Sequence, residues 1–181
     1  VESRGLGDVY KRQSPGSPKD APFGGSRNAY SSAGFSFNGF SQTATKLISK
    51  GMNVEEAKEE LLKQVRENFI SILSKRKEGQ PFAYWFGPTN VHRKWINGSG
   101  MNLWGISADS LKGKIPPFLP DVHTVREDFS DYLGEVKGFD LSLGVLIEEL
   151  KKVGLYDNTI IAISGDHGPA GFPYGKCNLY D

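Results

Sequence analysis

Cysteine is almost absent from this sequence, because Cys177 is the single one in 181 residues. An internal disulfide framework is therefore excluded, and cysteine usage gives no information about the compartment. An excess of charge of one sign is absent too: 22 Lys and Arg residues stand against 21 Asp and Glu residues, a formal net charge of +1. No global field then favours nucleic acid or a membrane surface as a partner, so any anion must be bound locally.

Long hydrophobic runs are also absent. No apolar run approaches the roughly 20 residues that a helix needs to cross a bilayer, and the amino terminus shows no signal-peptide pattern. Residues 1–13 have neither helical nor strand periodicity, and we interpret them as a cloning artefact or a disordered tail. We expect residues 14–181 to form one domain, because a chain of this length can bury a core.

Two long helices are predicted from apolar residues at three- and four-residue spacing. The first begins with Asn53 and Glu56, which have the spacing of a capping box, and its stripe is Val54, Ala57, Leu61, Val65, Phe69 and Ile72. The second begins with Thr124 and Glu127 and ends at Gly154, with the stripe Val125, Phe129, Tyr132, Val136, Phe139, Leu143, Leu146, Leu150 and Val153. Residues 26–51 and 101–120 show no such pattern and are expected to be irregular.

Glycines interrupt the second helix at Gly134, Gly138 and Gly144. Each lowers helix stability by roughly 1 kcal/mol relative to alanine. We expect them to allow a close approach to a neighbour or a kink. Asp128 and Asp140 lie on the same helix, where a surface or supporting role is favoured over direct binding of a metal.

Two short apolar runs predict buried strands. Residues 82–86 form an aromatic run after a Gly-Gln-Pro break, and residues 160–163 read Ile-Ile-Ala-Ile. The second run is typical of a parallel strand that is buried on both faces. Strands that alternate with long helices predict an α/β fold with a mainly parallel sheet flanked by helices.

Chemically active side chains follow both predicted strands. Asp166 and His167 come directly after the second strand, and Lys176 follows a loop rich in glycine and proline. His92 and Arg93 come shortly after the first strand. Ligands bind beyond the carboxyl ends of strands in open α/β sheets, so we expect four of these groups, Asp166, His167, Lys176 and His92, to face one cavity of the size of an oxyanion.

The sequence resembles the sulfatase family of the alkaline-phosphatase-like superfamily in three blocks. One contains Asp166-His167-Gly168, Gly175-Lys176 and Leu179-Tyr180; the others are residues 81–94 and 125–154. The similarity covers roughly residues 14–181 and is strongest to sulfatases of the heparan N-sulfatase type. It implies a sulfuric ester hydrolase, here an internal fragment of the catalytic domain that is incomplete at both ends.

The resemblance implies a role for each site residue. His92 would donate a proton to the departing group, and Lys176 would hold a sulfate oxygen. Arg93 would bind an anionic sugar, although an ordinary rim residue is the simpler interpretation. Asp166 and His167 would hold a divalent cation. Calcium is expected first because it prefers oxygen ligands. Zinc is expected second, because this chain has a histidine, His167, where many sulfatases have Asn.

Sulfatases use a formylglycine, made from cysteine or serine, as the nucleophile. The sequence contains no Cys-x-Pro-Ser-Arg or Ser-x-Pro-x-Arg segment that would become one. We therefore expect the 181-residue chain to be inactive alone, and sulfate release by the purified chain would contradict this. By resemblance we expect a periplasmic, extracellular or lysosome-like location.

Three functions stay open on the sequence. The first is hydrolysis of a sulfate ester or N-sulfate on a carbohydrate. The second is a phosphoester or phosphonate hydrolase of the same superfamily, which the adjacent Asp166 and His167 favour. The third is a non-catalytic carbohydrate-binding relative. A sulfated glycan or small molecule is the expected partner in the first case.

Overall fold

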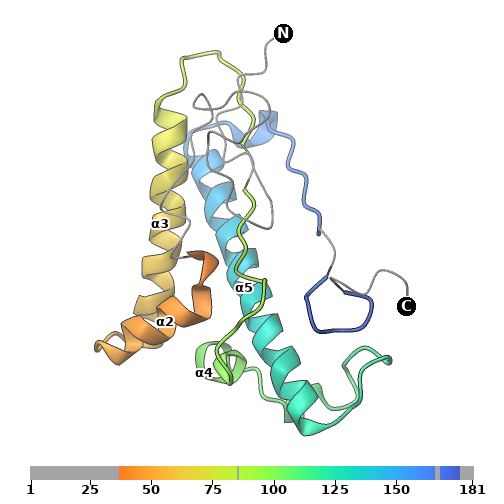
Figure 1. The fold of residues 1–181 in the computed structure, drawn as a ribbon. Helices are drawn as coiled ribbons and strands as arrows, with labels where there is room; N and C mark the ends of the chain where they lie inside the picture. The colour runs from red at the N-terminus through yellow and green to blue at the C-terminus, as the bar shows by residue number, and fades with distance from the viewer. Residues whose placement is uncertain (1–36, 85, 166–167, 176–181) are drawn as a thin grey trace, which may run out of the picture.

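The computed structural model describes residues 37–84, 86–165 and 168–175, and its regular elements within these ranges are helical. They are α2 (Phe40–Ser49), α3 (Val54–Ser74), α4 (Ser99–Trp104) and α5 (His123–Lys152), with the 3-10 turns η3 (Asp109–Leu111) and η4 (Tyr156–Asn158). Figure 1 shows α3 and α5 side by side, with α2 across the lower part of α3 and α4 beside the first half of α5. The interpretation of residues 1–13 lies outside the described residues.

The predicted α/β fold with a mainly parallel sheet is wrong, because no strand occurs within the described ranges. Ile160, predicted to be buried on both faces, is 98% exposed, and Ile161 and Ile163 are exposed as well. Phe82, Tyr84 and Phe86 do lie against the core, so this segment keeps one buried face. A strand forms only through hydrogen bonds to a neighbouring strand, and neither segment has such a neighbour in the described part of the chain.

The first predicted helix is confirmed as α3. Asn53 and Glu56 form the capping box: Asn53 Oδ1 accepts from the Glu56 N–H at 2.9 Å, and Glu56 Oε2 accepts from the Asn53 N–H at 2.9 Å. Both bonds satisfy amides that have no partner inside the helix. The predicted stripe is buried at Ala57, Leu61, Val65, Phe69 and Ile72.

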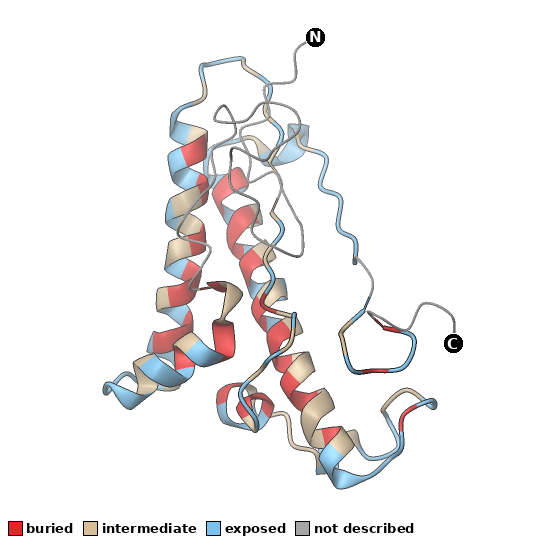
Figure 2. Ribbon diagram, in the orientation of Figure 1, coloured by how far each residue is buried: buried red, intermediate tan, exposed pale blue. Residues whose placement is uncertain are grey.

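The second predicted helix is confirmed as α5, but its start and its buried face differ. The helix begins at His123 with Val122 at the N-cap, so the predicted capping box of Thr124 and Glu127 is wrong. In the first half the buried residues are polar or small: Arg126, Ser130, Asp131, Gly134, Glu135 and Gly138. Figure 2 shows buried positions along most of the length of α5. Different segments pack against the two halves, and the apolar stripe alone did not contain this information.

The carboxyl end of α5 is a Schellman motif. The Leu155 N–H donates to the Leu150 carbonyl at 2.9 Å, and the Gly154 N–H donates to the Lys151 carbonyl at 3.1 Å. Gly154 has a φ of +69°, which glycine adopts without a steric penalty. The predicted helix end at Gly154 is confirmed.

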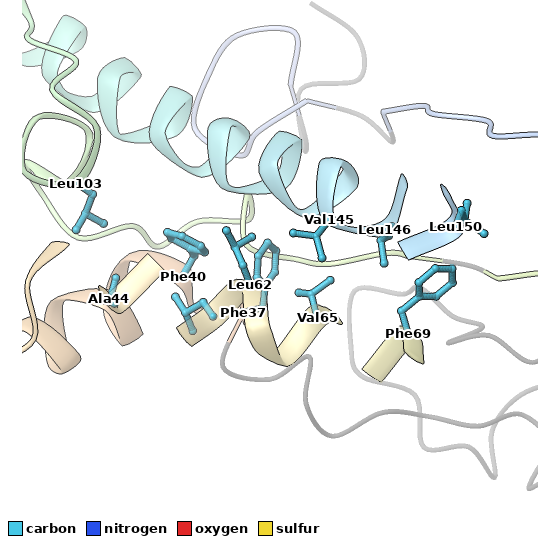
Figure 3. Close-up of a cluster of buried hydrophobic side chains, with 12 residues drawn as sticks. Phe37, Phe40, Ala44, Leu62, Val65, Phe69, Leu103, Val145, Leu146 and Leu150 are labelled. Atoms are coloured by element: carbon cyan, nitrogen blue, oxygen red, sulfur yellow. The ribbon is translucent and has the colours of Figure 1, made fainter. Parts of the chain in front are cut away.

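The hydrophobic core lies between α2, α3 and the second half of α5. Figure 3 shows these side chains meeting, among them Phe37, Phe40, Phe69, Val145 and Leu150. Phe40 also stacks on Trp104 of α4, with 5.7 Å between the ring centroids. The helix α2 and most of α4 fall in the segments 26–51 and 101–120, which were expected to be irregular. Both helices are short, with 10 and 6 residues, and helices of such lengths depend on packing against distant parts of the chain.

Glycines bring α4 and α2 close to the first half of α5. A Cβ on Gly100 would lie 2.2 Å from Ser130 Oγ, and one on Gly134 would lie 2.6 Å from Trp104 Cδ1. A Cβ on Gly138 would lie 3.3 Å from the ring of Phe40. The predicted close approach is confirmed at Gly134 and Gly138.

Candidate functional site

His92 lies on the exposed loop that leads from the aromatic segment to α4. Its N–H donates to the Thr89 carbonyl at 2.8 Å, which closes a tight turn. Its Nδ1 lies 2.5 Å from the Arg93 carbonyl oxygen. A carbonyl only accepts hydrogen bonds, so Nδ1 carries the proton in this arrangement. Nε2 is then the ring nitrogen at which a neutral His92 accepts a proton.

Arg93 joins three separate segments of the chain. Its guanidinium forms a forked ion pair with Asp128 of α5, with Nη1–Oδ1 at 2.6 Å and Nη2–Oδ2 at 2.7 Å. Its Nε–H donates to the Ala170 carbonyl at 2.8 Å. A fork of this kind fixes the direction of the guanidinium as well as its position. The loop of His92, the helix α5 and the 168–175 loop are therefore connected at one side chain.

Aromatic rings surround this junction. The guanidinium of Arg93 lies 4.2 Å from the centroid of the Trp95 ring and 5.1 Å from that of Phe172. Phe172 is only 6% exposed and packs on Trp95, Phe129 and Tyr132. Burial raises the pKa of Tyr132, which stays neutral near pH 7. These rings hold the 168–175 loop against the first half of α5.

Asn90 and Glu135 form a second connection between the same loop and α5. Asn90 Nδ2 donates to the Glu135 carbonyl at 2.7 Å and to Glu135 Oε2 at 3.3 Å. Glu135 Oε1 accepts from the Ser41 N–H of α2 at 3.2 Å. Both Asn90 and Glu135 are 2% exposed. Burial raises the pKa of Glu135, and the hydrogen bonds from Ser41 and Asn90 oppose that rise.

Asp131 connects α5 to the beginning of α4. Its carboxylate accepts from the Gly98 N–H at 3.0 Å and from the Gly100 N–H at 2.7 Å. Gly98 is the N-cap residue of α4 and has no side chain, so Asp131 supplies the capping oxygens from a neighbouring helix. Burial raises the pKa of Asp131, and its two backbone hydrogen bonds oppose the rise.

Asp128, Asp131 and Glu135 thus form a row of carboxylates on α5, which we name the acidic row. Their spacing of three and four residues puts them on one face of the helix. Each carboxylate takes a different partner from residues 90–100. Sequence reasoning favoured a supporting role for Asp128 and did not single out Asp131 or Glu135. The spacing of the three acids is the signal in the sequence that could have identified them.

Three predicted site residues, Asp166, His167 and Lys176, lie outside the described residues. The loop between them, residues 168–175, does contact Arg93 through Ala170. His92 and Arg93 therefore lie beside this loop, and the predicted roles of all five residues stay predictions. Within the described ranges, no group of three or more His, Cys, Asp or Glu side chains is placed to hold a metal ion.

Comparisons with known proteins place this sequence in a family. The model of the sulfatase family matches residues 7–180. An ulvan-active sulfatase of Formosa agariphila is 36% identical over 70 residues, which are 39% of this chain and 12% of that protein. The human N-sulphoglucosamine sulphohydrolase is 31% identical over 72 residues, which are 40% of this chain and 14% of that protein.

The matches thus cover about an eighth of the length of either relative. No solved structure matches the chain significantly. None of the helices in the described ranges has the length and apolar character to span a bilayer.

Proposed function

We propose, because the chain belongs to the sulfatase family, that it takes part in the hydrolysis of a sulfate ester or N-sulfate on a carbohydrate. The observation that carries this proposal is the family match over residues 7–180. The names of the two relatives support the substrate class, since one is an ulvan-active sulfatase and the other acts on N-sulphoglucosamine. The loop of His92 is compatible with that chemistry. It contains Arg93, which forms a bidentate ion pair with Asp128 and contacts the 168–175 loop.

His92 is the proposed proton donor to the departing group. A histidine suits this work because an imidazole ring both donates and accepts protons. The bond from Nδ1 to the Arg93 carbonyl orients the ring. Nε2 of the protonated ring would then deliver the proton to the bridging oxygen or nitrogen of the substrate.

Lys176 and Arg93 are the proposed groups for sulfate. Lysine places a mobile positive charge next to a sulfate oxygen on which negative charge grows during the reaction. Arg93 uses three of its five N–H groups for Asp128 and Ala170. Asp128 also neutralises its charge, so Lys176 has the larger proposed share in anion binding.

Asp166 and His167 are the proposed ligands of a divalent cation, calcium first and zinc second. When bound, such a cation would neutralise the charge of the sulfate group. A formylglycine is the nucleophile expected for the family, and no residue of the printed sequence lies in its motif. The proposed contribution of these 181 residues is therefore binding of the substrate and protonation of the departing group.

Calorimetric titration of the 181-residue chain tests this proposal. N-sulfoglucosamine should bind in the presence of calcium at least roughly tenfold more tightly than glucosamine, because one charge-assisted hydrogen bond contributes about that factor. Lys176→Met should remove the preference, and Asp166→Asn should remove the effect of calcium. The matched control Lys50→Met, at an exposed position of the described chain, should change neither. Equal affinity for the two sugars would contradict the proposal.

A phosphoester hydrolase is the second candidate, and the adjacent Asp166 and His167 favour it. Zinc enzymes of the same superfamily use adjacent Asp and His. The same titration separates the two functions when glucosamine 6-phosphate and zinc are added as further arms. Tighter binding of the phosphorylated sugar with zinc than of the sulfated sugar with calcium would support the second function.

A further inference from the structure

His92 lies between two residues whose side chains are both held by α5. Asn90, two positions before it, binds Glu135, and Arg93, one position after it, binds Asp128. Glu135 and Asp128 are two helical turns apart, a rise of about 10.5 Å. The two side chains therefore hold the loop to α5 on both sides of His92.

Glu135 and Asp128, which hold the loop, are carboxylates, and their chemistry suits orientation of a partner better than stability alone. Glu135 is a carboxylate with 2% exposure, and a buried carboxylate is often no better for stability than an apolar side chain of the same size. Its partners are an asparagine side chain and a backbone amide, both of which it orients. Asp128 likewise fixes a planar guanidinium through two parallel bonds. Both arrangements fix the direction in which the bound side chain of the loop points.

We propose that Asp128 and Glu135 are positioning residues for His92: Asp128 acts through Arg93 and Glu135 acts through Asn90. Together they hold the loop so that the imidazole keeps one orientation, with Nδ1 toward the Arg93 carbonyl. The 168–175 loop shares the Arg93 anchor through Ala170, so both loops depend on Asp128. The value of this orientation for proton transfer rests on the proposed function, whereas the orientation itself does not.

Hydrogen exchange of the His92 amide, measured by NMR on the 181-residue chain, tests the proposal. This amide donates to Thr89, and it exchanges only when the turn opens. Asp128→Asn and Glu135→Gln should each lower its protection by roughly tenfold or more, since each removes charge-assisted hydrogen bonds. The amides of Leu61 and Phe69 in α3 should keep their protection.

The ring of His92 gives a second readout. The chain has three histidines, so the His92 resonance is assigned by its loss in His92→Gln. It should shift in Asp128→Asn and return toward its position in the wild-type chain in Asp128→Glu, which keeps the charge. Asp140→Asn and Glu148→Gln make the same chemical changes at exposed positions of α5 and should leave both readouts unchanged.

Two results would overturn the proposal. One is an unchanged His92 amide and ring in both Asp128→Asn and Glu135→Gln. The other is an equal loss of protection at His92 and throughout α3, which would mean that the carboxylates serve global stability alone. Neither measurement uses a sulfated sugar, so a failed sugar titration and a failed positioning test are separate outcomes.

Discussion

The two halves of α5 hold the molecule together by different means. The second half buries Val145, Leu146 and Leu150 against α3, and such contacts are non-directional and proportional to the area buried. The first half carries the acidic row, in which Asp131 and Glu135 are buried and Asp128 is partly exposed, and the row binds named donors at 2.6 to 3.3 Å. Apolar packing tolerates small shifts, whereas hydrogen bonds to carboxylates do not. We infer that the second half stabilises the fold and the first half sets the position of the His92 loop.

The largest loss of stability is expected in the apolar core that α3 forms with the second half of α5. Phe69→Ala removes a ring that is 1% exposed and packs on Tyr84 with 4.8 Å between centroids. It should lower the free energy of unfolding by about 3–5 kcal/mol, measured by urea denaturation. The neighbouring Ile70 is 43% exposed, and Ile70→Ala should change stability by about 0.5 kcal/mol at most. Equal losses in the two variants would contradict the described core.

Close packing of α4 on α5 predicts that two glycine substitutions change the free energy of unfolding in opposite directions. Gly100→Ala places a Cβ 2.3 Å from the Ser130 carbonyl oxygen, so the helices must separate, at a cost of about 1–3 kcal/mol. A Cβ on Gly144 of α5 meets no neighbouring atom within 4 Å among the described residues, so Gly144→Ala should stabilise by about 0.5–1 kcal/mol through helix propensity. Thermal and urea unfolding measure both effects, and a neutral Gly100→Ala would show that the helices are further apart.

The acidic row is tested directly at Asp131. Asp131→Ala leaves the amides of Gly98 and Gly100, at the start of α4, without their acceptor, so it should lower the free energy of unfolding by about 1–3 kcal/mol. Asp140→Ala removes the same group from an exposed position of α5 and should have an effect of about 0.5 kcal/mol at most. If the two variants unfold at the same urea concentration, Asp131 does not cap α4.

The smallest effect is a dependence of stability on pH. Burial raises the pKa of Glu135 in the folded chain, so the folded state binds the proton more tightly than the unfolded state. The contribution of Glu135 to stability is then fully present below its unfolded pKa and is lost as pH rises through the folded pKa. The difference in unfolding free energy between wild type and Glu135→Gln should therefore change between these two pKa values.

Above the folded pKa of Glu135, the difference between the two proteins should be constant. Urea unfolding over a series of pH values gives this curve. A difference that does not vary with pH would contradict the described burial of Glu135. Asp121, whose pKa is lowered by its hydrogen bond from Arg126, has the opposite sign: its contribution is lost as pH falls through its folded pKa.

Sequence predicted the parts of the fold that depend on neighbours along the chain. Both bonds of the capping box at Asn53, the buried stripe of α3 and the end of α5 at Gly154 arise within a few residues of each other. The buried face of the first half of α5 was not predicted, because the hydrogen-bond partners of its carboxylates are 31 to 94 residues away. The predicted strands were wrong for the same reason, since pairing is decided by distant segments.

The candidate site divides in a similar way. His92 and Arg93 were identified from their place after an aromatic run, and the structure adds Asp128, Asn90 and Glu135 as the groups that hold them. No local pattern links Arg93 to Asp128. The resemblance to sulfatases indicated the family, which the family match establishes, but it did not indicate how α5 supports the loop.

The central claim is that the His92 loop and the 168–175 loop meet on the first half of α5. Spin labels at Lys94→Cys and Pro173→Cys, both at exposed positions, test it in a Cys177→Ser background. Pulsed electron paramagnetic resonance measures the distance distribution between the two labels. We predict one narrow distribution at short distance, which broadens when Asp128→Asn is added. A broad distribution in the chain with Asp128 intact would contradict the account.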